Sequence, residues 1–210
     1  MQITVPCDVF IRLAKVATAF EAERDTKYFN SVYFEAKDGK LIAISTNIKF
    51  ASIEFLGKTD QADGSFNVAC DPALITQCET EKQYKGTMQI VFMEALRYAS
   101  VKTTFGYNYP GNAAVFTETD NPAFERWRKW LPDKMPSERD SPMFVDAFNL
   151  AILAESSPSG AILFPEFTSS VVIVRDAYLD NWIGAFLGAG NAPDGRLLKD
   201  IPVKIPDWVR

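Results

Sequence analysis

Hydrophobic and polar positions follow the same order twice in the first half of the chain. Residues 1–5 form an alternating run that ends in Val5, and Asp8 and apolar residues at helical spacing follow it. The same order begins at residue 65, where Asp71 takes the place of Asp8. Asp is a preferred N-cap residue, and apolar positions three and four apart form one face of a helix. Each segment therefore predicts a strand that leads directly into an Asp-capped helix.

Each predicted helix is followed by three alternating segments, so each stretch is predicted to be a β-α-β-β-β unit. The first helix runs from Asp8 to about Phe20, and the second has Pro72 in its first turn. An Asp-Gly turn at residues 38–39 predicts a two-residue hairpin. The predicted strands after the first helix are 31–36, 41–46 and 48–57, and those after the second are 87–94, 97–107 and 113–119.

The order occurs a third time after a passage rich in Trp and Pro. Residues 143–145, the capping Asp146 and an apolar helix at 147–155 precede three further predicted strands, at 160–167, 169–176 and 181–188. Repeats of this length that each contribute strands favour a compact or ring-like sheet assembly over a stacked rod. The predicted organisation is a two-unit domain at 1–120, a connector at 121–142, a half domain at 143–190 and a C-terminal tail at 191–210.

Composition lowers the expectation of catalysis. The chain has no His, which excludes Ser-His and Cys-His nucleophile pairs, and its formal charge is −5. Cys7, Cys70 and Cys78 are odd in number and lack CxxC spacing, so they are predicted to be small buried hydrophobes. We predict a protein that is not an enzyme, without a metal or cofactor. The chain shows neither an apolar run long enough to span a bilayer nor a secretory signal at its start, and is placed in the cytoplasm.

The run of elements in residues 1–16, 31–46 and 65–78 resembles that of the DNA sliding clamps, the processivity rings of replicative polymerases, and most of all the bacterial polymerase III β subunit. The resemblance implies an α+β fold of β-α-β-β-β repeats, with mostly antiparallel sheets and with helices on one face that line a central hole. It implies double-stranded DNA, bound by its backbone without sequence preference, and a DNA polymerase or other replication protein as partners. The reduced size suggests a phage or mobile-element protein.

The number of units differs from that of the family. Bacterial clamp chains hold six units and the eukaryotic and phage kinds four, whereas this chain shows three. A ring of twelve units would then need four chains, so the resemblance implies a homotetramer in which the first unit of one chain covers the open edge of the third unit of the next. The alternative is a monomer or dimer in which the connector or the C-terminal tail covers that edge.

Basic residues in and after the first two helices are the candidate DNA contacts. Val9, Leu13, Val16 and Phe20 form an apolar stripe on the first predicted helix. Arg12 and Lys15 lie off this stripe and are expected to face outward, toward the hole of a clamp, where Lys and Arg contact phosphates. Each of these residues could equally be a solvated surface charge. The predicted DNA-binding residues are Arg12, Lys15, Arg24, Lys27, Lys82 and Lys85.

Three tryptophans are candidate partner-binding residues. Trp127 and Trp130 alternate with basic residues in a segment that can stack bases or connect two units, and Trp208 can anchor the tail to the chain itself or to another protein. The acidic residues Glu21, Glu23 and Asp25 are interspersed with cations and are expected to form a solvated loop. Two other functions stay open: a clamp-like adaptor or decoy that binds a protein and never encircles DNA, and a small carboxylate-dependent enzyme.

Overall fold

The computed structural model describes residues 1–19, 30–46, 50–93, 98–104, 115–116, 147–157, 161–168, 171–176, 178 and 181–187 of the chain. The first unit comprises β1 (Gln2–Pro6), α1 (Cys7–Thr18), β2 (Ser31–Lys37), β3 (Lys40–Thr46) and β4 (Phe50–Lys58). The second comprises β5 (Gly64–Ala69), α2 (Pro72–Lys82), β6 (Thr87–Met93), β7 (Tyr98–Thr103) and β8 (Val115–Phe116). The third comprises α4 (Ala147–Ser156), β9 (Ala161–Thr168), β10 (Val171–Asp176) and β11 (Trp182–Leu187).

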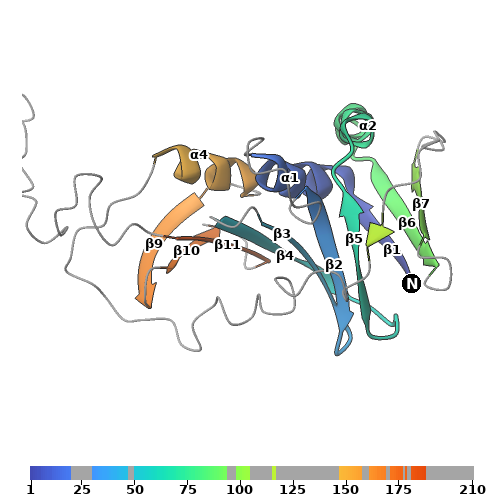
Figure 1. Cartoon of the computed structure of the whole chain (residues 1–210), viewed down its shortest axis with the longest axis horizontal. Coiled ribbons are helices and arrows are strands. Elements are labelled where there is room, and N and C mark those ends of the chain that lie inside the picture. The colour runs from blue at the N-terminus through green and yellow to red at the C-terminus, as the bar shows by residue number, and fades with distance from the viewer. Residues whose placement is uncertain are drawn as a thin grey trace, which may run out of the picture.

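The order of elements in the first two units is the predicted β-α-β-β-β. In the third unit the helix and the three following strands are present, and the strand predicted at 143–145 lies outside the described residues. The strands form an eight-stranded sheet in the order β8-β5-β2-β3-β4-β11-β10-β9 and a three-stranded sheet in the order β1-β6-β7. Every pairing described between strands is antiparallel, and the helices lie together on one side of the large sheet (Figure 1). The fold is α+β, as predicted.

The first two units exchange their first strands. β1 of the first unit pairs with β6 of the second, from Gln2↔Val91 to Pro6↔Thr87. β5 of the second unit pairs in return with β2 of the first, from Ser31↔Ala69 to Ala36↔Gly64. Each sheet of this pair of units therefore contains strands of both, and neither unit has a complete sheet by itself.

The first and third units share one continuous sheet. β4 pairs with β11, from Trp182↔Glu54 to Phe186↔Phe50. One edge of the third unit is thus covered by the first unit of the same chain, whereas the sequence reasoning left that edge for the next chain of a ring. Within the described part of the chain, the strand at the far end of the third unit is β9.

Two local predictions about turns and caps are confirmed and one is wrong. Asp38 and Gly39 have φ of 50° and 70°, which is the conformation that a two-residue hairpin turn requires. The Asp71 carboxylate accepts a hydrogen bond from the Ala73 amide at 2.8 Å and caps α2. Asp8 does not cap α1, because the helix begins one residue earlier, at Cys7, and Pro6 occupies the cap position without a side-chain bond.

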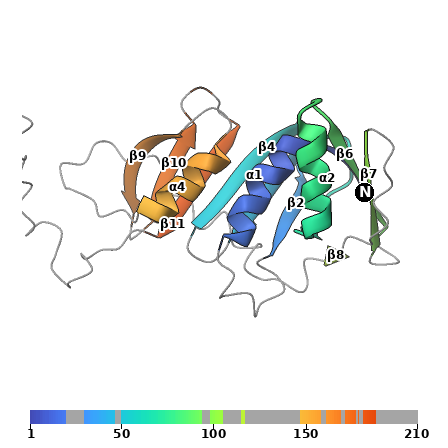
Figure 2. The ribbon, with the colours of Figure 1, turned by 90° about the horizontal axis from the view of Figure 1, so that it is seen from above.

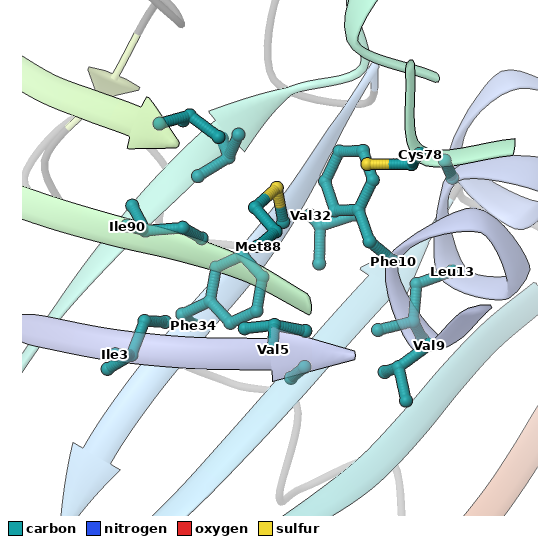
Figure 3. Close-up of a cluster of buried hydrophobic side chains, with 14 of the residues drawn as sticks. Ile3, Val5, Val9, Phe10, Leu13, Val32, Phe34, Cys78, Met88 and Ile90 are labelled. Atoms are coloured by element: carbon teal, nitrogen blue, oxygen red, sulfur yellow. The ribbon is translucent and has the colours of Figure 1, made fainter. Parts of the chain in front are cut away.

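The main apolar core lies between the two sheets and the helices α1 and α2 (Figure 3). Val9, Leu13 and Val16 of the predicted stripe are buried, and so are Phe10 and Ile11, which the stripe did not include. α1 is enclosed on more than one side because it lies between α2 and α4 as well as over the sheet (Figure 2). The three cysteines are buried free thiols, as predicted.

Candidate nucleic-acid interface

The three described helices form a layer over one face of the sheets, in the order α2, α1, α4 (Figures 1 and 2). We call this surface, with the turn that follows α2 as far as Lys85, the helix layer. It spans the junction between the first and third units because α1 contacts α4 directly. This is the face on which the predicted DNA-binding residues of the two N-terminal helices lie.

Arg12 does not project freely from this layer. Its Nη1 donates to Asp8 Oδ2 at 2.6 Å, and its Nη2 donates to the two Glu54 oxygens at 2.8 and 3.1 Å. The Arg12 side chain is 15% exposed and that of Glu54 is 3% exposed, so the pair is largely shielded from water. Two carboxylates already occupy the guanidinium, and the expectation that Arg12 faces outward as a free cation is wrong.

Lys15 lies on the exposed surface of the helix layer but also has an acidic partner. Its Nζ is 3.3 Å from Glu155 Oε2 of α4, and both side chains are about half exposed. An exposed pair of this kind exchanges readily with solvent ions and costs little to separate. Lys15 can therefore release Glu155 to contact a phosphate, whereas Arg12 cannot leave Glu54 at similar cost.

Lys82 and Lys85 lie at the C-terminal end of α2, as predicted. Lys82 is the last helical residue, and its Nζ is 4.0 Å from Glu79 Oε2, at the limit of an ion pair. Lys85 is exposed, has φ of 54°, and forms no ion pair with any other described residue. Cations in the last turn also offset the partial negative charge of a helix C-terminus, so both lysines have a structural role available as well.

The other predicted site residues, namely Arg24, Lys27, Trp127, Trp130 and Trp208, lie outside the described residues, as does the acidic segment around Glu21. Their roles stay predictions.

Acids and cations are nearly balanced on the helix layer. The cations are Arg12, Lys15, Lys82 and Lys85, and the acids that are at least partly exposed are Asp8, Asp71, Glu79 and Glu155. A surface that holds DNA by its backbone usually has an excess of Lys and Arg. The described part of this layer therefore offers at most a few weak phosphate contacts.

Several residues that the sequence reasoning missed join the first and third units beneath the helix layer. The Trp182 indole donates to Ser52 Oγ at 2.8 Å, and both side chains are buried. The Trp182 ring lies over Gly184, where an added Cβ would come within 2.7 Å of it and within 3.2 Å of Leu153 on α4. The sequence offered one signal of a buried polar contact in this region. Glu54 is an acid in a largely apolar strand, and a buried carboxylate needs a partner.

The described groups with shifted pKa values, namely Cys7, Glu54, Cys70 and Cys78, are all buried. Burial raises the pKa of the Cys70 thiol to about 12, which keeps this thiol protonated and unreactive. Burial also raises the pKa of Glu54, although Arg12 acts in the opposite direction. Within the described ranges no group of three or more His, Cys, Asp or Glu side chains is placed to hold a metal ion. None of the described helices has both the length and the apolar character needed to cross a membrane.

Comparison with known proteins gives matches to solved structures alone. No protein-family model matches the sequence, and no curated protein matches it. The DNA polymerase III subunit β of Pseudomonas aeruginosa has a TM-score of 0.61 at 10% identity, over 90% of this chain and 66% of that one. The sliding clamp of Caulobacter crescentus has a TM-score of 0.60 at 11% identity, over 100% and 68%. That of Bartonella birtlesii has a TM-score of 0.56 at 12% identity, over 97% and 67%.

The chain spans about two thirds of the length of these clamps. The likeness extends over nearly all of this chain, whereas the sequence resemblance rested on segments of the first two units. Over the part that it spans, the chain therefore has the fold of the bacterial DNA polymerase III β sliding clamps.

Proposed function

We propose that the protein is a DNA-tethering clamp, a processivity factor that holds duplex DNA against its helix layer. The observation that carries this proposal is the single layer of α2, α1 and α4 across a sheet that continues from the first unit into the third. The junction between the first and third units is held by the pairing of β4 with β11 and by the Trp182–Ser52 bond. A rigid junction between units is what a protein needs in order to hold a fixed curvature around DNA.

The proposed DNA contacts are few and weak. Lys15, Lys82 and Lys85 are the exposed cations of the helix layer, and Arg24 and Lys27 stay in the proposal from the sequence alone. With so few cations on the described surface, retention would come from enclosure rather than from affinity, and weak backbone contacts permit sliding. Arg12 is assigned to its ion pairs within the first unit instead of to DNA.

The test compares retention on closed circular and linear duplex of the same sequence. An enclosing clamp remains on the circle and leaves the linear form through its ends, and blocking both ends with a bulky bound protein restores retention. Equal retention on open linear and circular DNA, or none on either under all loading conditions, would contradict the proposal.

A second test addresses the lysines. The double variant Lys82→Ala/Lys85→Ala should reduce the slope of log K against log salt by about 0.9 for each phosphate that the protein no longer neutralises, or roughly 1.8 for two. Lys37 and Lys40 are exposed at the β2–β3 hairpin, away from the helix layer, and their double Ala variant is the matched control. If both variants change the slope equally, the helix layer has no special role in binding.

The partners and setting follow from the proposed clamp. They are double-stranded DNA and a polymerase or another replication protein, with Trp127, Trp130 and Trp208 as candidate partner contacts, in the cytoplasm of a host of a phage or mobile element. A ring of twelve units would be a homotetramer with a mass near four times 23.5 kDa.

A second function, that of a clamp-like adaptor which binds another protein, is favoured by one observation. The described helix layer holds four acids that are at least partly exposed against four cations, and three of those cations have acidic partners within 4.0 Å. An adaptor would keep its partner at salt concentrations that remove DNA and would show no preference for circular DNA. The circle-versus-linear experiment therefore separates the two functions.

A further inference from the structure

Two of the three buried cysteines lie in contact with each other. Cys7 is the first residue of α1, and Cys78 lies in the middle of α2. Their side chains are hydrogen-bonded to each other, and both belong to the main apolar core, with 0% exposure. Figure 3 shows the Cys78 sulfur directed from α2 toward Phe10, which lies about one turn after Cys7 on α1. Neither thiol has a role in the proposed clamp.

The backbone holds the start of α1 against this side of α2 independently of the two sulfurs. The Cys7 amide donates to the Gly86 carbonyl at 3.0 Å, and the Gly86 amide donates to the Glu81 carbonyl at 2.9 Å. Gly86 packs so closely that an added Cβ would come within 2.7 Å of the Glu81 side chain. Glu81 is three residues after Cys78 and is buried on the same face of α2. Main-chain bonds therefore place Cys7 beside the face of α2 that contains Cys78.

The surroundings make Cys7 the more readily ionised thiol of the two. Their hydrogen bond lowers the pKa of Cys7, although burial and the charge of Glu81 act in the opposite direction, and it raises the pKa of Cys78. Cys7 also lies in the first turn of α1, where the amides of a helix N-terminus stabilise negative charge. At Cys70, burial raises the pKa to about 12. The thiol that ionises most easily is thus the one that has a second thiol beside it.

α2 is held to the rest of the protein less firmly than α1. The buried residues of α2 are Leu74, Cys78 and Glu81, against eight buried residues of α1. Glu81 also weakens the contact, since its buried Oε2 accepts no hydrogen bond from the described residues. An element with few buried apolar contacts opens at a lower free energy than that of global unfolding. Local opening of α2 therefore gives a small molecule access to both thiols while the sheets stay folded.

We propose that Cys7 and Cys78 are a reversible thiol–disulfide pair, and that oxidation fastens α2 to the start of α1. The oxidant is a small-molecule disulfide such as oxidised glutathione. The Cys7 thiolate attacks one sulfur of this disulfide and releases one small thiol, and Cys78 then attacks the mixed disulfide at Cys7 and releases the second. The two protein thiols lose two electrons and two protons, and the two departing thiols gain them. Because a disulfide has an S–S distance of about 2 Å, α2 also moves closer to α1 on oxidation.

The two thiols fit a disulfide better than they fit a metal ion. A structural zinc site has four protein ligands, and the described residues contain no group of three or more His, Cys, Asp or Glu side chains placed to hold a metal. A disulfide needs only the two thiols that are already in contact.

The inference goes beyond the proposed function, because the disulfide forms whether or not the protein holds DNA. Lys82 ends α2 and Lys85 follows it, so the oxidised form presents these two proposed DNA contacts on a helix that no longer opens. A chain that forms the disulfide but is not retained on circular DNA would overturn the clamp function alone. A chain that is retained on circles but never forms the disulfide would overturn the thiol–disulfide pair alone.

The first experiment incubates the full chain with oxidised glutathione and maps the cysteines by alkylation, digestion and mass spectrometry. The wild type should lose two of its three free thiols and give a peptide that links Cys7 to Cys78, while Cys70 remains free. Excess reduced glutathione should restore all three thiols. Three free thiols at every ratio of oxidised to reduced glutathione would overturn the proposal. So would a link to Cys70, or glutathione that stays on Cys7 or Cys78 without resolving into a link between them.

The second experiment measures what the bond does to α2. Hydrogen exchange of the α2 amides should slow on oxidation. Tm should rise by on the order of 10 °C, because the bond closes a loop of about 70 residues in the unfolded chain. Cys70→Ala keeps both thiols and should show both effects, whereas Cys78→Ala should show neither when its treated and untreated forms are compared. Equal α2 exchange in the oxidised and reduced wild type, or the same effects in Cys78→Ala, would overturn the proposal.

Discussion

Replacing Arg12 with Ala is expected to destabilise the protein far more than its position on a surface helix suggests. The substitution removes the sole described cation within bonding distance of Glu54, whose side chain is 3% exposed. Glu54 would then have to remain charged without a partner in a buried site or take up a proton. Asp8 would lose the same partner, but its side chain is 46% exposed and water can replace the bond.

The magnitude follows from this difference in burial. Breaking a buried ion pair by removing one partner costs about 3–5 kcal/mol, whereas an exposed pair contributes about 0–1 kcal/mol. For a chain of this size each kcal/mol lowers Tm by about 2–4 °C, so Arg12→Ala should lower Tm by on the order of 10 °C. Lys15→Ala, which breaks the exposed pair with Glu155 on the same helix, is the matched control and should lower it by at most a few degrees.

The assay is thermal and urea unfolding followed by circular dichroism, with a double variant to isolate the cause. Arg12→Met/Glu54→Gln removes both charges and should recover most of the loss, because no unpaired buried charge remains. If Arg12→Ala and Lys15→Ala are equally mild, the Arg12–Glu54 pair contributes no more to stability than an exposed ion pair does. If the double variant is as unstable as Arg12→Ala, the loss comes from packing instead of from charge.

The pH dependence of the free energy of unfolding tests the Arg12–Glu54 pair independently. Burial raises the pKa of Glu54 in the folded state above its ordinary value of 4.5. A raised carboxyl pKa contributes stability that is present below that value and is lost as the pH rises through the folded-state pKa. As the pH rises above the ordinary carboxyl value of 4.5, the wild type should therefore lose stability relative to Glu54→Gln. A difference in urea midpoint that stays constant, or that changes in the opposite direction, would contradict the burial argument.

Three further substitutions test other parts of the fold, each by urea denaturation. Trp182→Phe removes the indole donor, leaves Ser52 without that bond and should cost about 1–3 kcal/mol, part of which Ser52→Ala in the same chain should recover. Asp71→Ala removes the cap on the Ala73 amide and should cost about 1 kcal/mol, whereas Asp71→Asn should cost much less. Gly39→Ala forces a Cβ into a backbone with φ of 70° and should cost about 1–2 kcal/mol; an unchanged midpoint would mean that the turn adopts another conformation.

Local sequence patterns predicted the structure correctly where the interactions that determine it are between residues close together in the chain. The hairpin at Asp38–Gly39 and the cap at Asp71 depend on residues within a few positions of each other, and both are present as predicted. At Asp8, a shift of one residue in the start of the helix was enough to make the predicted cap wrong. Pro6 ends β1 and α1 begins at Cys7, so Asp8 falls in the first turn and bonds Arg12 instead of the helix amides.

Features that depend on distant residues could not be predicted from such patterns. Arg12 is 42 positions from Glu54 and Ser52 is 130 positions from Trp182, and no periodicity within a helix or strand selects those partners. Helical spacing places Arg12 off the apolar stripe but does not reveal that β4 presents a carboxylate beside it. The pairing of β4 with β11 has the same origin, because the alternation in each strand defines its faces but not its neighbours.

The exchange of first strands also has a consequence for synthesis of the chain. Gln2 pairs with Val91, so Gln2 is synthesised 89 residues before its partner residue. At about 5–20 residues per second, β1 waits roughly 4–18 s with its backbone groups unpaired. Ile3 and Val5, buried in the finished protein, are in contact with water during this time. The nascent chain therefore exposes apolar surface for a period before β6 is made. Slower translation or a higher temperature should increase aggregation of this chain more than that of a protein whose strands pair with near neighbours in sequence.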